Sequence, residues 1–581
     1  MMTEPSYEAG RSGLKFKEKA AAGVIGALVL ASSAAIGAPA AVPDTGTIMR
    51  GIEKTLPPPP PVLVQPLPEQ RMLSPDDKAA RFFVRDLHIE ATLFPEATLK
   101  ALVSGYIGRE VSVGELEQAA GLIAGFYRDH DLLARAFVPQ QSVKDGVVVI
   151  RVLEASLGEV KVEPTDKTRL DPEIARGYVL DRQAVGGYLH PTELEESILL
   201  LNDLPGVNAK AVLQQGAKEG DTNAVVQMDE GDLFAGSVTF DNFGSRSVGM
   251  MRSLGQLSVN DPAGIGDKGG VLLLKTSHSS YARFDYGLPV GYSGLRLGAD
   301  ISMLYYDLDN DFPTLKGNGL GFNGGVNARY PLIRSTDISL AVQGSWEYRH
   351  LLNAASGATT ADRQVNAVQV GLEGTEADAW FGGGNCNFAA SGIGGTVDLS
   401  NTASDAAADA AGARSAGVYG KFMANFSRMQ HLTEGLSGLL SVQGQWGMKN
   451  LDSSEKFSLG GPTAIRAFAV NEASGDAGWL ATAELRYAVT DTMQLKTYYD
   501  AGGILLHHDT WNGWASSGND RNSYRLQGVG IGSAWMPLPA LSLRFDLVHR
   551  VGGNPGHDAN GHDSAGLNGL NQMWIQGSYL F

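Results

Sequence analysis

Cysteine is nearly absent from this sequence of 581 residues, in which Cys386 is the only one. A single cysteine excludes a disulfide framework and any metal site built from paired cysteines within the chain. We therefore expect Cys386 to be an ordinary residue of a strand or a loop.

Long apolar runs and net positive charge are also lacking. After residue 40, no segment offers the roughly 18 apolar residues that a membrane-spanning helix needs. The formal net charge is −17, which argues against nucleic acid as the main partner. No phosphate-binding G-x-x-x-x-G-K-[ST] motif occurs, and no spacing suggests a catalytic triad. We expect no nucleotide, no cofactor and no catalytic residue, so the chain is predicted not to be an enzyme.

The first 40 residues have the features of an export signal. Basic residues precede the apolar run "AAAGVIGALVLASSAAIGAPA" (20–40), and Ala38 and Ala40 form an A-x-A cleavage site. Because the run is rich in Ala and Gly, we predict a signal peptide over 1–40 rather than a membrane anchor. An exported chain without further helical spans is a periplasmic protein, a secreted protein or an outer-membrane barrel.

Residues 41–70 contain two distinct segments. "TGTIMRGIEK" (45–54) could form a short helix, and "TLPPPPPVLVQPLPEQ" (55–70) is a proline-rich linker that should be extended and semi-rigid.

Residues 78–232 have a mixed α/β pattern, in which one order of strands and helices occurs twice. In the first copy, five apolar residues recur at helical spacing within 112–130: Leu116, Ala119, Ala120, Ile123 and Tyr127. The elements predicted there are a strand over 81–92, helices over 95–108 and 112–130, and strands from 134 and over 146–155. A second strand–helix–helix–strand–strand unit follows, so we predict a repeat of two domains, 78–155 and 156–232.

Residues 233–581 show no convincing helix and many segments with a period of two. In "GWLATAELRYA" (478–488), Trp479, Leu485 and Tyr487 share an apolar face, whereas Glu484 and Arg486 lie on the other. A sandwich core could not hold such charges, but a barrel with a polar interior can. At roughly 20 to 22 residues per strand and connection, about sixteen strands are expected.

Three further features belong to this region. The chain ends in an aromatic residue, Phe581, on the apolar face of its last strand. The low-complexity insertion 400–417 is interpreted as a surface loop. "GGNPGHDANGHDSAG" (552–566) resembles a loose metal-binding loop, but a solvated extracellular loop is the favoured interpretation, and we predict no metal site.

Several motifs, taken together and in order, resemble those of one family. They are "FYRDHDLLARAFVPQQ" (126–141), "LNDLPGV" (201–207), "DNFGSRSVGMMR" (241–252), "FSLGGPTAIRAF" (457–468), "ELRY" (484–487) and "YYDAGGI" (498–504). They are similar to those of TpsB outer-membrane transporters of two-partner secretion, the haemolysin secretion/activation proteins of the ShlB/FhaC/HecB type. The resemblance implies a mainly β fold, in which two periplasmic α/β POTRA domains precede a transmembrane antiparallel β-barrel of about sixteen strands.

The resemblance also implies where the functional residues lie. In the family a long loop, here 450–477, folds into the lumen and its arginine, here Arg466, meets a wall aspartate, here Asp500. The alternation of apolar and polar residues over 493–502 independently places Asp500 on the lumen side, where its carboxylate could pair with a guanidinium in bidentate fashion. The remaining motif residues are Gly460, Gly461, Pro462, Ile465 and Phe468 in the loop, Tyr499 and Gly502 on the wall, and Pro139, Gln140, Leu204, Pro205 and Gly206 in the POTRA domains.

The sequence departs from the family pattern at Ala467, where a glycine usually follows the arginine. The helix over 45–54 is the candidate for a plug of the lumen. The resemblance implies that the protein lies in the outer membrane of a Gram-negative bacterium, in contact with outer-membrane lipid. There it would export a TpsA-like exoprotein that is unfolded in transit. The alternatives are an outer-membrane protein insertase of the same superfamily and a general diffusion porin.

Overall fold

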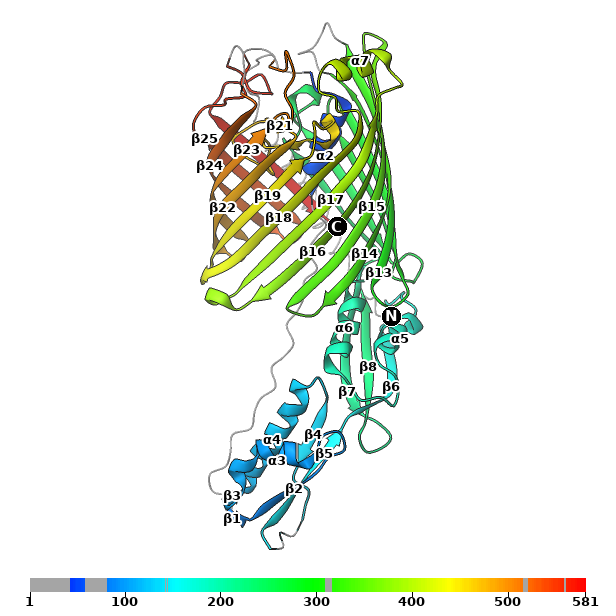
Figure 1. Ribbon diagram of the computed structural model, residues 1–581, viewed down its shortest axis with the longest axis vertical. Coiled ribbons are helices and arrows are strands. Elements are labelled where there is room, and N and C mark those ends of the chain that lie inside the picture. Colours follow the sequence, from blue (N-terminus) through cyan, green and yellow to red (C-terminus); the bar gives the residue numbers. More distant parts are fainter. Residues whose placement is uncertain are drawn as a thin grey trace, which may run out of the picture.

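The computed structural model describes residues 42–57, 81–141, 143, 145–308, 316–515, 521–558 and 561–581. The predicted signal peptide and most of the proline-rich linker lie outside these residues. A closed barrel of sixteen strands is joined to two small α/β domains, which lie below it in Figure 1. The helix α2 (Thr45–Lys54) lies inside the barrel, far from the domains that follow it in the sequence.

The first small domain is built on one long amphipathic helix. The five apolar residues predicted for its buried face are all buried, and Ser112 and Glu115 form a capping box at its start. The elements are β1 (Arg81–Val84), β2 (Asp86–Glu90), α3 (Glu96–Leu102), η1 (Ser104–Tyr106), β3 (Arg109–Ser112), α4 (Val113–Asp129), β4 (Ala134–Phe137) and β5 (Val147–Glu154).

Two predictions for this domain were wrong in detail. The strand expected over 81–92 is two strands, of which β1 pairs with β3 and β2 with β5. The helix expected over 95–108 ends at Leu102. The cause is local, because Gly105 and Gly108 follow and Gly108 adopts a positive φ of 79°. Such a backbone suits glycine and turns the chain into β3.

The second small domain repeats the topology of the first. In both, the last strand lies in the middle of a three-stranded sheet, parallel to the first strand of that sheet and antiparallel to the strand before it in the sequence. The elements of the second are β6 (Ser156–Pro164), α5 (Pro172–Arg182), α6 (Pro191–Asn202), β7 (Val207–Gln215) and β8 (Asp221–Glu230). This shared topology is the internal repeat expected from the sequence.

The barrel strands pair with their sequence neighbours, except that a long loop separates β19 from β22. Their bounds are β9 (Phe234–Asp241), β10 (Arg252–Asn260), β11 (Lys268–Lys275), β12 (Ser279–Val290), β13 (Leu295–Asp307), β14 (Gly317–Arg334), β15 (Ile338–Ala355), β16 (Ala358–Asp378), β17 (Gly384–Asp398), β18 (Gly417–Thr433), β19 (Leu436–Gly447), β22 (Ala477–Thr490), β23 (Met493–Leu505), β24 (Ser523–Leu538), β25 (Leu541–Arg550) and β26 (Asn571–Leu580).

The period of two separates the two faces of the barrel wall, as predicted. On β22, Leu485 and Tyr487 are 49% and 54% exposed on the outer face, whereas the neighbouring Glu484 is 6% exposed and points inward. The barrel closes where β26 pairs with β9. There the backbone of Phe581 exchanges two hydrogen bonds with that of Gly236, and its ring covers the space that a Cβ at Gly236 would need.

One expectation for the region after residue 233 was wrong. The insertion 400–417 contains the helix α7 (Ala403–Ala411), not only a loop. Its composition explains the difference, because alanine has the highest intrinsic helix propensity and six of these nine residues are alanine. Within the described residues, no helix is both long and apolar enough to cross a bilayer.

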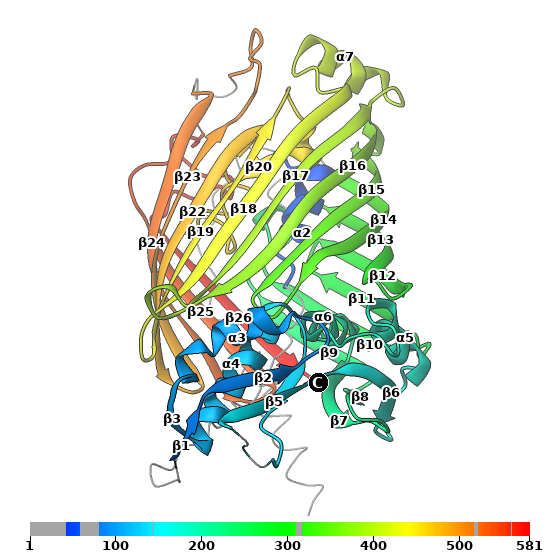
Figure 2. The ribbon, with the colours of Figure 1, turned by 60° about the horizontal axis from the view of Figure 1, so that its bottom comes forward.

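The "LNDLPGV" motif lies where the second small domain contacts the barrel, with α6 next to the barrel rim (Figure 2). Leu204 is buried against Gly266 in the β10–β11 turn. Asp203 accepts two hydrogen bonds, at 2.9 and 2.8 Å, from the guanidinium of Arg334 on β14. The Asp203 carbonyl also accepts a bond from Arg296, so the motif holds the domain against the barrel.

Loss of this contact should loosen the domain without unfolding it. We expect Arg334→Ala to raise amide hydrogen exchange in the turn 203–206, because a bidentate ion pair is lost. Exchange in α4 of the first domain should stay unchanged. The matched control is Arg329→Ala, which removes an ion pair with Glu373 on the same barrel. Equal exchange in both variants would contradict the role of the pair.

Candidate functional site in the barrel lumen

The loop between β19 and β22 folds back into the lumen, where it forms a buried cluster with the inner wall. It contains η4 (Ser453–Glu455) and the short strands β20 (Phe457–Ser458) and β21 (Ser474–Gly475). Gly461 has a φ of 123°, and a Cβ on Gly460 would approach the Ala469 carbonyl oxygen to 2.0 Å. The Gly-Gly-Pro segment of the motif therefore requires its glycines. Ile465 and Phe468 of the loop are both fully buried in the cluster with the wall.

The structure brings Arg466 against Asp500. The Nε and Nη2 atoms of Arg466 donate to the two carboxylate oxygens of Asp500 at 2.9 and 2.8 Å. The Arg466 backbone N–H donates to the same carboxylate at 3.2 Å. Asp500 is fully buried and also accepts a bond from the Thr482 hydroxyl. This pair is thus shielded from water, so breaking it would leave an uncompensated buried charge.

Three further contacts of Arg466 were not predicted from the sequence. Its Nη1 donates to Glu484 at 2.9 Å, and its guanidinium carbon lies 3.2 Å from the ring centroid of Tyr498. Its carbonyl accepts a bond from the indole of Trp574 at 2.8 Å. The alternation that placed Asp500 inside also places Glu484 and Tyr498 inside. That signal could have found both, whereas the Trp574 contact depends on the closure of the barrel.

The wall opposite the loop is shaped by glycines. A Cβ on Gly502 would approach Leu459 and Ile465 to within about 3.0 Å, and one on Gly528 would lie 2.5 Å from the Cβ of Ala467. The departure from the family pattern at Ala467 is therefore accommodated by Gly528. The motif residue Tyr499 lies on the outer face instead, where its hydroxyl contacts Gln527.

The helix α2 also lies in the upper part of the lumen, against the wall (Figure 1). Asp44 caps its first turn, and Ile48, Met49 and Ile52 pack against inward-facing residues of the wall. These wall residues are Leu254, Leu272, Leu274, Tyr281, Leu304, Tyr306 and Leu351. The Thr45 N–H and hydroxyl both donate to Asn353 on β15. An apolar stripe and a polar terminus thus hold the helix on the wall.

The helix and the loop contact each other through cations on the helix. Arg50 donates to the carbonyls of Ser453 and Lys456 and to the hydroxyl of Ser474. Lys54 donates to the carbonyl of Ser458 at 2.6 Å. Neither cation has a carboxylate partner within ion-pair distance among the ion pairs of the described residues. Arg50 and Lys54 therefore bind uncharged oxygens of the loop, whereas Asp44 at the start of the helix lies 3.8 Å from the guanidinium of Arg363 on the wall.

Ion pairs with the wall hold the start of the loop. Glu455 pairs with Arg349 at 2.6 Å and with Lys421 at 2.8 Å. Asp452 pairs with Arg363 at 2.8 Å. The loop is therefore attached to the wall at its start by these pairs and at its tip by Arg466.

The described residues between β25 and β26 contact the lumen loop. The buried Glu472 accepts bonds from the Asn554 side chain and from the Ser564 N–H. Asp563 pairs with Arg550 at 2.9 Å. The predicted solvated loop is thus partly packed against the protein. No cluster of three or more potential metal ligands is found among the residues that the structure describes.

The POTRA motif residues lie outside the lumen. Pro139 and Gln140 are in the connection after β4, where the next residue, Gln141, exchanges two hydrogen bonds with the backbone of Val149. Leu204, Pro205 and Gly206 form the turn at the barrel contact described above, and Gly206 has a φ of 81°. Pro139 and Gln140 thus belong to the first small domain, and Leu204, Pro205 and Gly206 lie where the second is attached to the barrel.

Comparisons with known proteins agree with this architecture. Residues 220–534 match the family model of the haemolysin secretion/activation protein ShlB/FhaC/HecB, and residues 82–155 match that of the ShlB-type POTRA domain. The chain is 26% identical over 467 residues to the heme/hemopexin transporter protein HuxB of Haemophilus influenzae (strain 86-028NP), which covers 78% of this chain and 81% of HuxB.

Two further comparisons concern CdiB. The chain is 24% identical over 458 residues to the outer membrane transporter CdiB of Dickeya dadantii (strain 3937), covering 75% of this chain and 78% of that one. The solved structure of CdiB from Escherichia coli superposes with a TM-score of 0.66 at 18% identity, covering 88% and 93% of the two chains. The chain therefore belongs to the ShlB/FhaC/HecB family of haemolysin secretion/activation proteins and is an outer-membrane transporter of two-partner secretion, with its POTRA domains in the periplasm.

Proposed function

We propose that the structure represents the closed state of a passive translocation pore, in which α2 and the inward loop together obstruct the lumen. The observation that carries this proposal is the contact of Arg50 and Lys54 with the loop backbone inside the barrel. An exoprotein passes only when α2 leaves the lumen. The loop stays, because its buried Arg466 has two carboxylate partners whereas the helix cations contact carbonyls and hydroxyls.

The partner exoprotein enters unfolded from the periplasm and is recognised by the POTRA domains. The strand β7 (Val207–Gln215) lies at the edge of its sheet, and no described strand pairs with its outer side. Val212 and Leu213 on this strand are both about two-fifths exposed. An extended peptide adds to such an edge through backbone hydrogen bonds. Recognition therefore depends on the backbone of the peptide more than on a long specific sequence.

Translocation of this kind needs no catalytic residue and no nucleotide, and we assign none. Folding of the exoprotein outside the cell favours outward movement over return. The outer face of the barrel, with its apolar residues such as Leu485, contacts outer-membrane lipid.

Removal of the plug should open the pore. In planar bilayers, we expect the wild type to be mostly closed, deletion of 42–57 to give large openings, and Arg466→Ala to give wider or noisier ones. Arg50→Ala should open intermittently, because α2 then keeps its apolar contacts but loses bonds to the loop.

Arg81→Ala is the control for these conductance measurements, since it removes a surface ion pair of the first POTRA domain. Its conductance should equal that of the wild type. A wild type with steady, large conductance that the deletion leaves unchanged would refute the closed state.

The Arg466 cluster should dominate the stability of the loop. Arg466→Met leaves Asp500 and Glu484 as buried carboxylates near each other, so we expect a loss of about 3–5 kcal/mol. Adding Asp500→Asn should recover part of this loss, because one buried charge is removed. Thermal unfolding, followed by the shift in gel migration of the heated barrel, measures both effects.

Arg329→Met is the matched control, because its pair with Glu373 is more than one-third exposed on both sides. Exposed pairs contribute only about 0–1 kcal/mol. If Arg466→Met unfolded at the same temperature as this control, the cluster would have no special role.

A proline scan tests recognition at β7. Adjacent residues of an edge strand direct their N–H groups alternately inward to the sheet and outward to solvent. One of the variants Val212→Pro and Leu213→Pro removes an N–H group that points to solvent. We expect this variant to fold normally but to lose export of the partner, since proline has no N–H to donate to the added peptide. The other should destabilise the domain. Normal export by the variant that folds would exclude β7 as the binding edge, while leaving the plug proposal intact.

A further inference from the structure

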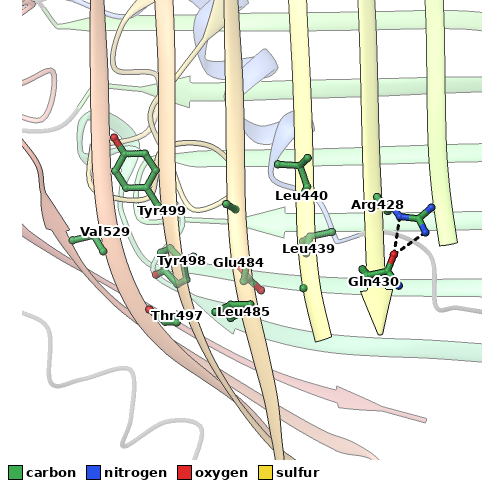
Figure 3. Close-up of a pocket in the computed structure, with 12 residues that line it drawn as sticks. Arg428, Gln430, Leu439, Leu440, Glu484, Leu485, Thr497, Tyr498, Tyr499 and Val529 are labelled. Atoms are coloured by element: carbon green, nitrogen blue, oxygen red, sulfur yellow. Dashed lines mark hydrogen bonds between the residues drawn. The ribbon is translucent and has the colours of Figure 1, made fainter. Parts of the chain in front are cut away.

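A shallow groove of about 490 Å³ crosses the outer face of the barrel, over β18, β19, β22, β23 and β24 (Figure 3). Leu440, Leu485 and Tyr499 border it, and each is between 43% and 49% exposed. Glu484 and Tyr498 border the groove from within the wall, but their contacts with Arg466 place their side chains in the lumen. The groove is therefore separate from the lumen site and lies on the lipid-facing surface.

The shape and chemistry of the groove suit a hydrocarbon chain. Small residues, Gly438, Ala483 and Thr497, lie between larger ones on paired strands. The larger residues include Leu440, Leu485, Tyr499 and Val529. Aliphatic and aromatic carbon on both sides of a small-residue floor increases van der Waals contact with a flexible chain, and it offers little to a polar ligand.

The groove ends at Arg428, whose hydrogen-bond donors all have acceptors within the protein. Arg428, near the end of β18, makes a bidentate ion pair with Asp378 at 2.6 and 3.0 Å. Its other three N–H groups donate to Gln430, twice, and to the sulfur of Cys386. All five donors of the guanidinium thus have acceptors. Arg428 is charge-balanced and has no free donor for a phosphate group.

Two exposed aromatic residues lie beyond this polar end. Trp380 and Phe381, in the turn η3 (Trp380–Gly382) between β16 and β17, are 72% and 90% exposed. The Gln430 amide donates to the carbonyls of Trp380 and Gly383 at 3.0 and 2.9 Å and so holds the turn. Aromatic residues concentrate where a barrel leaves the hydrocarbon region. The turn is on the periplasmic side, which places the groove in the periplasmic leaflet.

We propose that this groove binds one acyl chain of a phospholipid from the periplasmic leaflet of the outer membrane. The chain lies along Leu440, Leu485 and Tyr499, with the headgroup at the level of Arg428. Continuity with the lipid-facing surface selects lipid as the occupant. Because Arg428 is fully paired, the site selects the hydrocarbon chain and not the headgroup.

Native mass spectrometry of the full-length protein tests the proposal. The protein is extracted by mild detergent from liposomes of phosphatidylethanolamine and phosphatidylglycerol with identical acyl chains. We expect the wild type to retain one phospholipid more than Gly438→Leu. The two headgroups should occur in the retained lipid in the same proportions as in the liposome. Gly438 suits the test because a Cβ there meets only Leu432 and Leu485, at 3.5 and 3.9 Å. Retention should fall about tenfold, as expected when about two methylene groups lose contact.

Gly392→Leu is the matched control. Gly392 lies on the outer face, paired with the exposed Val370 and Phe422, and a Cβ added to it would meet no atom within 4 Å. It should retain lipid like the wild type, and Ala483→Phe, a second groove variant, should lose it. The proposal would be overturned if the wild type and both groove variants retained phospholipid equally. It would also be overturned if the retained lipid favoured one headgroup, or if Gly392→Leu lost as much lipid as the groove variants.

Discussion

The buried guanidinium of Arg466 is the constraint on which the interior of this transporter depends. A charge that cannot be deprotonated is stable in a water-poor lumen only when carboxylates surround it. Asp500 and Glu484, on the neighbouring strands β23 and β22, supply two. Once Arg466 is held, the loop backbone from Lys456 to Ser458 is fixed at the place where α2 binds. The helix therefore depends on both the loop and the wall, and the loop depends on the barrel.

The two kinds of attachment differ in reversibility. The loop is covalently continuous with the wall at both ends and is held by buried ion pairs at its start and tip. The helix α2 is held by an apolar stripe, by bonds from Arg50 and Lys54 to uncharged oxygens, and at its start by a longer ion pair, 3.8 Å, between Asp44 and Arg363. In the proposed function the helix leaves the lumen during transport, and the second kind of attachment suits this because water can solvate the cations that its departure exposes.

Local sequence accounted well for elements whose pattern and environment agree. The helix α4 and the two-sided strands followed from spacing alone, because burial on one face imposes a period of 3.6 or of 2. The prediction failed at 95–108, where the helix ends at Leu102 ahead of Gly105 and Gly108, and at 400–417, where a low-complexity segment was interpreted as a loop. In both places the backbone preference of glycine or alanine decided the structure.

The sequence by itself determined the class of fold, the inward face of Asp500 and, through resemblance, its pairing with Arg466. The second carboxylate at Glu484, the indole of Trp574 against the Arg466 carbonyl, and the fit of Ala467 on Gly528 were decided by the closed barrel. These contacts join residues that are 18 to 108 positions apart. Periodicity assigns a side chain to a face, but only closure and strand register decide which residues of that face meet.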